Sequence, residues 1–286
     1  MTRISAFLLT IVCMLVLALP ASAQEATPEA TPSPEAVPSY EILLPQVVNQ
    51  LTHSTSDFTQ GLVWSDGRLL QSAGRYGQSR IQELDPESGE VLRETPLDNT
   101  FFAEGLAMVN DQLVQITWKE QTALIWDPDT FEQVGTFSYD TEGWGLCSDG
   151  SVIYMSDGTP NLSVRDSGTF ELLDTIPVTL EGQAVPEINE LECVDGNVWA
   201  NIWQLPVLVR IDPQTGVINA IADMRSLLTQ DIVDNWANGA VLNGIAYIPE
   251  RDSFLITGKN WPVMYEVTFV PVEPAPEATP EATPAS

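Results

Sequence analysis

The sequence predicts an all-β protein, a five-bladed β-propeller built from four-stranded antiparallel blades. From residue 58 onward, short runs rich in Val, Ile, Leu, Thr, Trp and Tyr alternate with turn signals such as Asp-Gly, Ser-Gly and Asp-Pro, a pattern typical of strands joined by tight turns. Only residues 224–228, with an extension toward Trp236, favour a helix. Two short units also recur at the spacing of a propeller blade.

The first recurring unit carries a polar or aromatic residue in front of a glycine-leucine pair or a variant of that pair. Successive copies begin 44, 40, 45 and 54 residues apart. Since a period of about 40–45 residues with four short strands is typical of a propeller blade, five copies predict five blades. The copies are Gln60-Gly61-Leu62, Glu104-Gly105-Leu106, Trp144-Gly145-Leu146, Asn189-Glu190-Leu191 and Asn243-Gly244-Ile245.

The second recurring unit is an aspartate, usually followed by proline, that precedes Thr or Ser and then Gly or Phe. Because these residue types favour tight turns, we expect the unit between the two outer strands of each blade. The first unit would then open the innermost strand, with its leucine packed between blades and the residue before glycine facing the central channel. The second unit begins at Asp85, Asp127, Asp166 and Asp212.

The residues that differ between copies at the channel position are candidates for function, whereas the repeated leucines and turn aspartates are structural. For each candidate, ordinary packing near the axis is the alternative. The candidates are Gln60, Glu104, Trp144, Asn189 and Asn243.

Glu104 is a lone carboxyl group between aromatic residues and a glycine, in the run Phe101-Phe102-Ala103-Glu104-Gly105. Apolar surroundings disfavour the ionised form, so we expect its pKa to rise toward neutrality, where a carboxyl group can both accept and return a proton. The alternative is that Glu104 only caps a turn beside the glycine.

Three tryptophans, Trp118, Trp144 and Trp203, fall in three successive predicted blades and would meet near the axis. Aromatic walls with indole N–H donors are typical of a pocket for a small ligand. Lys259 lies late in the last blade and is expected to face the same channel.

Other catalytic signatures are absent from the sequence. His53 is the only histidine and is expected on the surface, and no nucleophile elbow, phosphate-binding glycine loop or Cys/His metal spacing occurs. These absences argue against a Ser-His-Asp hydrolase and a histidine-bound zinc enzyme. The sequence therefore predicts neither a metal nor a cofactor.

The two ends of the chain differ in composition from the middle. Residues 1–23 resemble a secretory signal peptide, with Arg3, an apolar run over residues 6–19 and Ala21-Ser22-Ala23 before the expected cut. Residues 24–38 and 271–286 contain mainly Pro, Ala, Thr and Glu, so we expect a disordered linker and tail around a folded domain at residues 39–270. No later run reaches about 18 apolar residues, so we expect a protein without membrane association after cleavage, secreted or periplasmic.

The chain is strongly acidic, with 40 Asp and Glu against 11 Lys and Arg and a net charge of −29. Such a field repels phosphate backbones and anionic lipid, which argues against nucleic-acid binding, and it suits a substrate with a free amino group. Solubility outside the cell is an equally good explanation. After loss of Cys13 with the signal, Cys147 and Cys193 could form a disulfide or remain two free thiols.

Ten motifs, in chain order across residues 58–268, closely resemble the plant and bacterial type of glutaminyl-peptide cyclotransferase. The motifs are Phe58-Thr59-Gln60-Gly61-Leu62, Tyr76-Gly77-Gln78-Ser79, Phe102-Ala103-Glu104-Gly105-Leu106, Thr117-Trp118-Lys119, Glu142-Gly143-Trp144-Gly145-Leu146, Met155-Ser156-Asp157-Gly158, Asn189-Glu190-Leu191-Glu192, Ala200-Asn201-Ile202-Trp203, Leu242-Asn243-Gly244-Ile245-Ala246 and Thr257-Gly258-Lys259-Asn260-Trp261-Pro262.

The resemblance implies a five-bladed propeller without a catalytic metal, and an acyltransferase that converts the N-terminal glutamine of peptides or proteins to pyroglutamate with release of ammonia. It implies that Glu104 is the general acid/base and that indole N–H groups, Asn189 or Lys259 are the available donors for the oxyanion. Ala103 departs from the family, whose members tend to carry glycine or a larger residue there. The implied substrate-binding residues are Phe58, Gln60, Phe102, Trp118, Trp144, Asn189, Trp203 and Lys259.

Two other functions stay open at this point. One is a non-catalytic exported propeller that binds a ligand or protein partner on its axial face, because a fold does not settle a function. The other is a calcium-dependent, lactonase-like propeller, which would need several Asp, Asn or Glu side chains around one ion. We expect a monomer, and the sequence does not determine substrate preference beyond the first residue.

Overall fold

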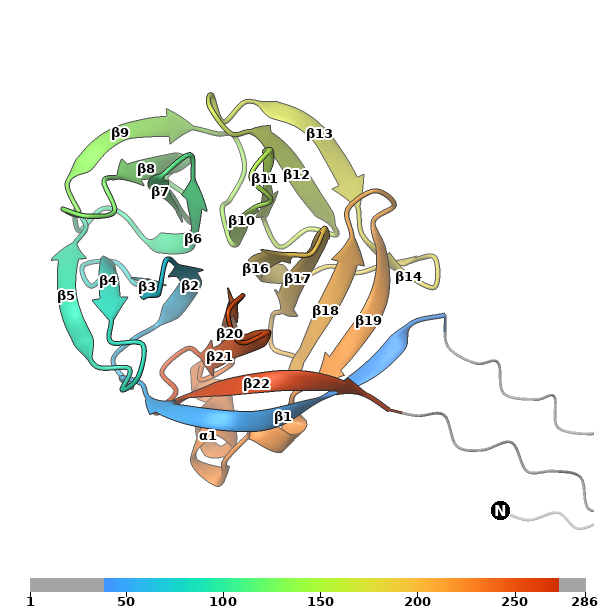
Figure 1. Ribbon diagram of the computed structural model, residues 1–286. Coiled ribbons are helices and arrows are strands. Elements are labelled where there is room, and N and C mark those ends of the chain that lie inside the picture. Colours follow the sequence, from blue (N-terminus) through green and yellow to red (C-terminus); the bar gives the residue numbers. More distant parts are fainter. Residues whose placement is uncertain (1–38, 273–286) are drawn as a thin grey trace, which may run out of the picture. The chain divides into compact units, whose positions relative to one another are not determined.

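The computed structural model describes residues 39–272, which are all-β apart from one short helical segment, as predicted. Three separate sheets each consist of four consecutive antiparallel strands, which confirms the predicted sheet type (Figure 1). They contain β2 (Thr59–Ser65), β3 (Arg68–Ala73), β4 (Arg80–Leu84) and β5 (Val91–Pro96); β6 (Ala103–Val109), β7 (Gln112–Thr117), β8 (Thr122–Trp126) and β9 (Gln133–Ser138); and β10 (Leu146–Ser148), β11 (Val152–Ser156), β12 (Asn161–Asp166) and β13 (Leu172–Pro177).

The remaining strands form one ten-stranded sheet instead of further separate sheets. Strand β1, which the sequence pattern did not predict, makes the junction because it pairs parallel to β19 and antiparallel to β22. This pairing covers two strand edges that would otherwise be free to pair with other chains. The strands, in spatial order, are β16 (Ile188–Val194), β17 (Asn197–Ile202), β18 (Val207–Asp212), β19 (Val217–Asp223), β1 (Glu41–Thr52), β22 (Val263–Pro271), β21 (Ser253–Gly258) and β20 (Leu242–Ile248), with the hairpin β14 (Thr179–Leu180) and β15 (Gln183–Ala184) beside β19.

The innermost strands close a ring, in which β2 contacts β6, β6 contacts β10, β10 contacts β16, β16 contacts β20, and β20 contacts β2. The first recurring unit lies at the start of each of these strands or directly before it, as predicted. Its glycines allow the close approach, since a Cβ at Gly105 would lie 2.6 Å from the backbone nitrogen of Leu146. The apolar residue of the unit is fully buried in every copy: Leu62, Leu106, Leu146, Leu191 and Ile245.

The second recurring unit forms the predicted outer turns. The Asp127 carboxylate accepts the backbone N–H of Thr130 at 2.8 Å, and the Asp166 carboxylate accepts that of Thr169 at the same distance. The Asp85 and Asp212 carboxylates likewise accept backbone N–H groups of their turns, from Ser88 and Gln214. Such bonds satisfy backbone donors that the strands leave free.

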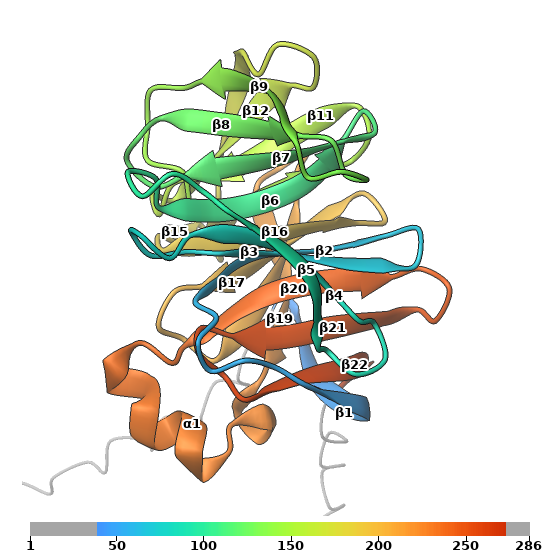
Figure 2. The same ribbon diagram turned by 90° about the vertical axis from the view of Figure 1, so that its left-hand side faces the viewer.

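The helical segment lies where the sequence predicts it, between β19 and β20. It contains the 3-10 helix η1 (Arg225–Leu227), α1 (Gln230–Asn235) and the 3-10 helix η2 (Trp236–Asn238). Thr229 caps α1, because its side chain accepts the backbone N–H of Ile232. Figure 2 shows this segment at the lower left of the view, where it projects beyond the strands.

Cys147 and Cys193 form a disulfide with a Cα–Cα distance of 5.5 Å, which decides between the two alternatives left open by the sequence. The bond joins β10 to β16, two neighbouring strands of the inner ring. The predicted signal peptide (residues 1–23), the linker (residues 24–38) and all but the first two residues of the predicted tail (residues 271–286) lie outside the described residues. Within residues 39–272, no helix is long and apolar enough to cross a membrane.

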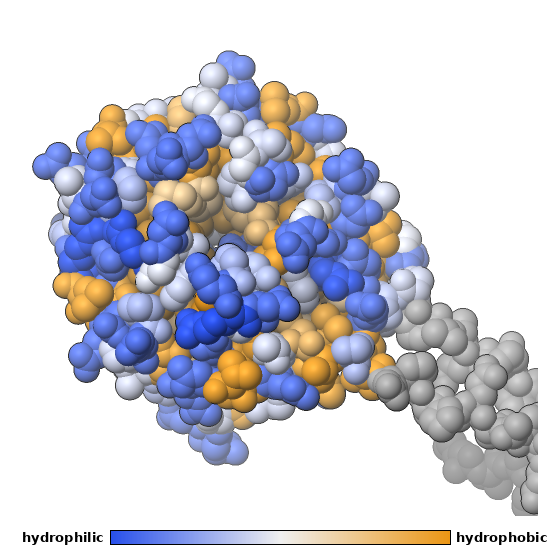
Figure 3. All heavy atoms as spheres, in the orientation of Figure 1, coloured by the Kyte–Doolittle hydropathy of each residue, from blue (hydrophilic) through white to orange (hydrophobic). Residues whose placement is uncertain are grey.

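The face in Figure 3 is hollowed at its centre and carries mainly hydrophilic residues, with apolar residues scattered between them. Scattered apolar residues are normal on a water-exposed surface.

Candidate active site

One cavity of about 230 Å³ gathers Glu104 and the eight substrate-binding residues that the family resemblance implies, but not the channel candidate Asn243. The cavity lies against the inner ring, and its lining is largely apolar. The lining residues are Phe58, Gln60, Phe102, Glu104, Trp118, Trp144, Asn189, Trp203 and Lys259. We call this space the Glu104 cavity.

Strand direction explains why these residues meet at one end of the ring. Gln60, Glu104 and Asn189 lie at the starts of inner strands, whereas Trp118, Trp203 and Lys259 directly follow the ends of the second strands β7, β17 and β21. In an antiparallel pair, the start of one strand and the end of its neighbour lie at the same edge. Of the remaining three residues, Phe58 and Phe102 immediately precede inner strands, and Trp144 lies two residues before β10.

Glu104 is buried, with 5% of its surface exposed. Burial raises the pKa of its carboxyl group well above the usual value; the charge of Lys259 opposes this rise, and the charges of Glu142 and Glu120 add to it. No side chain or backbone group of residues 39–272 forms a hydrogen bond with this carboxyl group. The predicted rise of the Glu104 pKa is confirmed. The carboxyl group faces cavity space that a ligand could occupy.

Lys259 is the second titratable group of the cavity and is 4% exposed. Burial lowers the pKa of its ammonium group to about 8, although the charge of Glu104 favours the protonated form. Its Nζ lies 4.9 Å from the centre of the Phe58 ring, within the range of a cation–π contact. Near neutral pH, Lys259 remains mostly protonated and can donate hydrogen bonds into the cavity.

The aromatic walls are held by edge-to-face contacts. The ring centres of Phe102 and Trp118 lie 5.6 Å apart, and those of Trp144 and Trp203 are also 5.6 Å apart. Phe58 meets Phe102 edge-on at 6.2 Å. Such pairs prefer fixed relative orientations, so the walls define the shape of the cavity.

Comparisons with known proteins agree with this geometry. The family model described as glutamine cyclotransferase matches residues 12–269. The chain belongs to this family. A curated relative from Arabidopsis thaliana, named glutaminyl-peptide cyclotransferase, is 34% identical over 225 residues, which cover 78% of this chain and 70% of the relative. The solved structure of Myxococcus xanthus glutaminyl cyclase matches with a TM-score of 0.76 and 36% identity, over 82% of this chain and 100% of that chain.

Glu142 is a site residue to which the sequence reasoning assigned no role. Its Oε2 accepts the indole N–H of Trp118 at 2.7 Å and that of Trp144 at 3.1 Å, while its Oε1 lies 3.6 Å from the Lys119 ammonium. The sequence offered one signal for this role: Glu142 lies two residues before Trp144, in a motif that resembles the family. These two indoles already donate to Glu142, which leaves the Trp203 indole, Asn189 and Lys259 among the oxyanion donors that the sequence offered.

Asn189 and Asn243 behave differently although both occupy the predicted channel position. Asn189 is 3% exposed and lines the cavity, and its Oδ1 has no hydrogen-bond partner among the described residues. Asn243 does not line the cavity; its Nδ2 donates to the backbone oxygen of Thr59 at 2.9 Å, and its Oδ1 likewise has no partner among the described residues. Both unpaired oxygens are fully buried, so Asn189 meets the cavity with other atoms of its side chain.

His53 is buried, and the expectation that it lies on the surface is wrong. Its Nδ1 lies 2.8 Å from the backbone oxygen of Trp261, and its Nε2 lies 2.9 Å from Gln71 Oε1. The ring thus links the chain before β2 to the turn after β21, and it does not line the Glu104 cavity. In the part of the chain that the structure describes, no group of three His, Cys, Asp or Glu side chains is placed to hold a metal ion.

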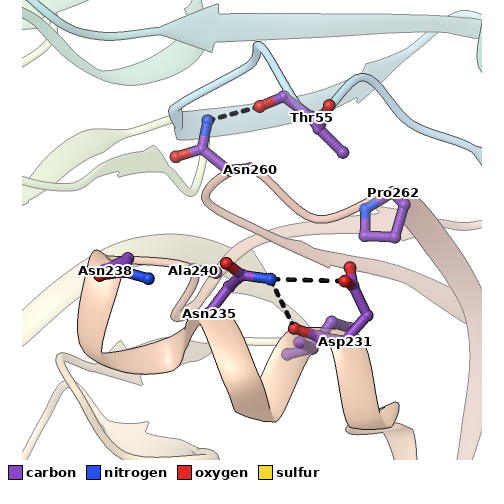
Figure 4. A pocket seen from close by; sticks show the side chains of 8 residues that line it. Thr55, Asp231, Asn235, Asn238, Ala240, Asn260 and Pro262 are labelled. Carbon is purple, nitrogen blue, oxygen red and sulfur yellow. Dashed lines mark hydrogen bonds between the residues drawn. The ribbon is translucent and has the colours of Figure 1, made fainter.

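A larger cavity of about 350 Å³ lies beside α1 but has different chemistry (Figure 4). Its polar groups largely satisfy one another: Asn235 donates to the Asp231 backbone oxygen at 2.9 Å, and Asn260 donates to that of Thr55 at 2.8 Å. Its single carboxylate, on Asp231, belongs to an exposed residue. The Glu104 cavity, with a buried acid and a buried base, is the better candidate for catalysis.

Proposed function

We propose that this protein is a glutaminyl-peptide cyclotransferase, which converts the N-terminal glutamine of peptides and proteins to pyroglutamate with release of ammonia. Family membership supports this activity. The observation that carries the mechanism is a buried carboxyl group with a raised pKa, which has no internal hydrogen-bond partner and faces an aromatic cavity.

The reaction is an intramolecular acyl transfer. The α-amine of the glutamine attacks its own side-chain amide carbon, a new C–N bond closes a five-membered lactam, and the bond to the amide nitrogen breaks. Glu104 accepts the proton that the attacking amine loses and returns it to the departing nitrogen, which leaves as ammonia. Because both reactants belong to one residue, the enzyme has to supply orientation and proton transfer.

The other cavity residues have binding roles in this proposal. Lys259 donates to the oxygen that becomes negatively charged when the amine attacks. Its positive charge and the apolar walls also favour a neutral α-amine, the form that can attack. Asn189 lines the cavity and contacts the substrate. The glutamine side chain and backbone are held by Phe58, Gln60, Phe102, Trp118, Trp144 and Trp203.

We also infer that residues 39–270 form a five-bladed propeller. Support comes from the five inner strands that close a ring, and from the strand order of the large sheet, which contains two antiparallel four-strand sets joined where β1 meets β19. The five blades would be β2–β5, β6–β9, β10–β13, β16–β19, and β20–β22 with β1. Residues 1–23 would direct export, to the periplasm or outside the cell, of a monomer that needs no metal or cofactor.

Glu104→Gln tests the catalytic role, since it keeps the shape of the side chain and removes the proton acceptor. We expect ammonia release from Gln-β-naphthylamide to fall by about 10²–10⁴-fold, with an unchanged circular dichroism spectrum. Glu132→Gln, at an exposed outer turn, is the matched control and should retain full activity.

The two possible failures differ in meaning. Near-wild-type turnover by Glu104→Gln would refute the assignment of Glu104 but not the activity. Absence of ammonia release by the wild type from any peptide with N-terminal glutamine would favour the non-catalytic propeller that binds a ligand on its axial face.

A further inference from the structure

A second hollow adjoins the Glu104 cavity and has no role in the chemistry proposed above. It has a volume of about 430 Å³ and shares Phe58 and Trp203 with the cavity. Its other lining residues come from the turn after β3, the loop after β17 and the 3-10 helix η2 with the residues behind it: Arg75, Gln204, Trp236, Ala237, Asn238, Gly239 and Val241. We call it the Arg75 groove.

The Glu104 cavity is too small to hold most of a peptide substrate. At about 230 Å³, the cavity is smaller than the pockets of about 300–1,000 Å³ that enclose drug-sized ligands. It can hold a glutamine residue, but the chain that follows this residue must leave across the rim. Since Phe58 and Trp203 border both spaces, the Arg75 groove is the neighbouring space into which that chain can extend.

Arg75 is the charged residue of the groove. It is half-buried, its guanidinium carbon lies 4.4 Å from the centre of the Phe58 ring, and one of its NH₂ groups donates to Asn260 Oδ1 at 3.0 Å. These two contacts hold the guanidinium plane in place. Among the described residues, no carboxylate lies within 4.0 Å of this guanidinium.

The lack of a carboxylate partner is unusual in this chain, which has 40 acidic and only 11 basic residues. Arg68, Arg80 and Arg93 each contact at least one carboxylate. A fixed guanidinium presents several N–H donors that match the geometry of a carboxylate. Arg75 therefore has free donors of the kind that an acidic ligand would use.

We propose that the Arg75 groove binds the residue that follows the N-terminal glutamine of the substrate, and that Arg75 selects an acidic side chain at this position. This inference rests on the proposed function. Trp203 and Trp236 form apolar walls against which the methylene groups of such a side chain can pack. Phe58 would then contact the glutamine on one side and support Arg75 on the other.

The test compares two peptides of nearly equal shape, Gln-Glu-Ala amide and Gln-Gln-Ala amide. The wild type should show a kcat/KM about three- to fivefold higher for the acidic peptide, the range expected for a partly exposed charge pair, and the preference should shrink in 0.5 M salt. Gln-Ala-Glu amide, with the acid one position further on, should show a smaller preference. In Arg75→Gln the ratio of kcat/KM values should fall to about one.

The ratio is the informative quantity because Arg75 also affects Lys259. The positive charge of Arg75 contributes to the lowered pKa of Lys259, after burial, so Arg75→Gln changes the rates of both peptides together. Arg75→Lys keeps the charge and should retain part of the preference. Arg225→Gln removes an equal charge from an exposed side chain that pairs with the nearby Asp223, and it should leave the ratio unchanged.

Equal rates for the two tripeptides in the wild type would overturn the inference while leaving the cyclase function intact, as would a preference that survives Arg75→Gln. Calorimetric binding of both peptides to Glu104→Gln provides a test that does not need turnover. Tighter binding of the acidic peptide to Glu104→Gln, lost in Glu104→Gln/Arg75→Gln, would support the role of the groove. This support would hold even if the wild type releases no ammonia. Absence of ammonia release would overturn only the proposed function.

Discussion

Replacing Glu142 with glutamine tests whether one carboxylate both orders the aromatic wall and adjusts the proton affinity of Glu104. Both indole N–H bonds, from Trp118 and Trp144, end on the same oxygen, Oε2. Glutamine can still offer an oxygen to these donors, but it removes the negative charge. Charge-assisted hydrogen bonds are about twice as strong as neutral ones, so the substitution weakens the two hydrogen bonds that hold the indoles but does not remove them.

The expected loss is moderate. A neutral hydrogen bond contributes about 0.5–1.5 kcal/mol net. Losing the charge assistance therefore costs a further amount of about this size for each of the two hydrogen bonds. The Glu142 side chain is 40% exposed, and solvent screening reduces this cost. We expect about 1 kcal/mol in total, which corresponds to a decrease in kcat/KM of about fivefold.

The same substitution should shift the pH dependence. Burial is the main cause of the raised pKa of Glu104, and the negative charge of Glu142 raises it further. Glu104 must be unprotonated to accept the proton of the attacking amine, so kcat/KM rises with pH through its pKa. Removing the charge of Glu142 lowers this pKa, and the acidic limb of the profile should move to lower pH.

The assay is the pH profile of kcat/KM for Gln-β-naphthylamide, measured at constant ionic strength for the wild type, Glu142→Gln and the control Glu132→Gln. Glu132 is exposed in an outer turn, and its substitution should leave the profile unchanged. An acidic limb that stays in place in Glu142→Gln, or moves to higher pH, would refute the electrostatic coupling. An unchanged kcat/KM would refute the role of Glu142 in positioning the indoles.

Three further predictions follow from the site, the disulfide and the predicted N-terminus. Activity should survive EDTA and 1,10-phenanthroline; strong inhibition that zinc or calcium reverses would instead show a metal requirement. The Cys147→Ser/Cys193→Ser variant should lose about 4 kcal/mol of unfolding free energy in urea titrations, because the bond closes a loop with a sequence separation of 46 residues; a loss below about 1 kcal/mol would contradict this. If cleavage follows Ala23, the exposed Gln24 should be found as pyroglutamate, lighter by one ammonia in intact-mass spectra of freshly exported protein. An equal fraction of unmodified Gln24 in Glu104→Gln would rule out self-processing.

The repeat in the sequence was sufficient to predict much of the structure. The recurring glycine and leucine positions indicate where inner strands approach closely, so the sequence places Gln60, Glu104 and Asn189 at one end of a ring. Strand β1 was not predicted, because its pairing depends on the edges of two strands, β19 and β22, that are far from it in sequence. Pairing of this kind is a property of the closed ring and leaves no local period in the chain.

Side-chain partners were harder to predict than positions. His53 was expected on the surface, since nothing in its neighbouring residues indicates that Trp261 and Gln71 lie beside it in the fold. Indole N–H groups were among the available oxyanion donors, and the structure shows that a carboxylate two residues from Trp144 accepts the N–H groups of both Trp118 and Trp144. For His53 and Trp118 the partner comes from another strand or turn, and the sequence does not reveal which polar groups meet.

Glu190 shows how a departure from the repeat can support the site. The other four copies carry glycine at this position, and a Cβ at Gly145 would lie 2.1 Å from the backbone oxygen of Asn189, so most neighbours in the ring leave no room for a side chain. Glu190 is fully buried, and its two carboxylate oxygens accept the backbone N–H groups of Leu62 at 3.2 Å and Ile245 at 2.8 Å. One carboxylate thus bonds β16 to β2 and to β20 across the ring. Because Glu190 directly follows Asn189, these bonds fix the backbone at the point where Asn189 lines the cavity.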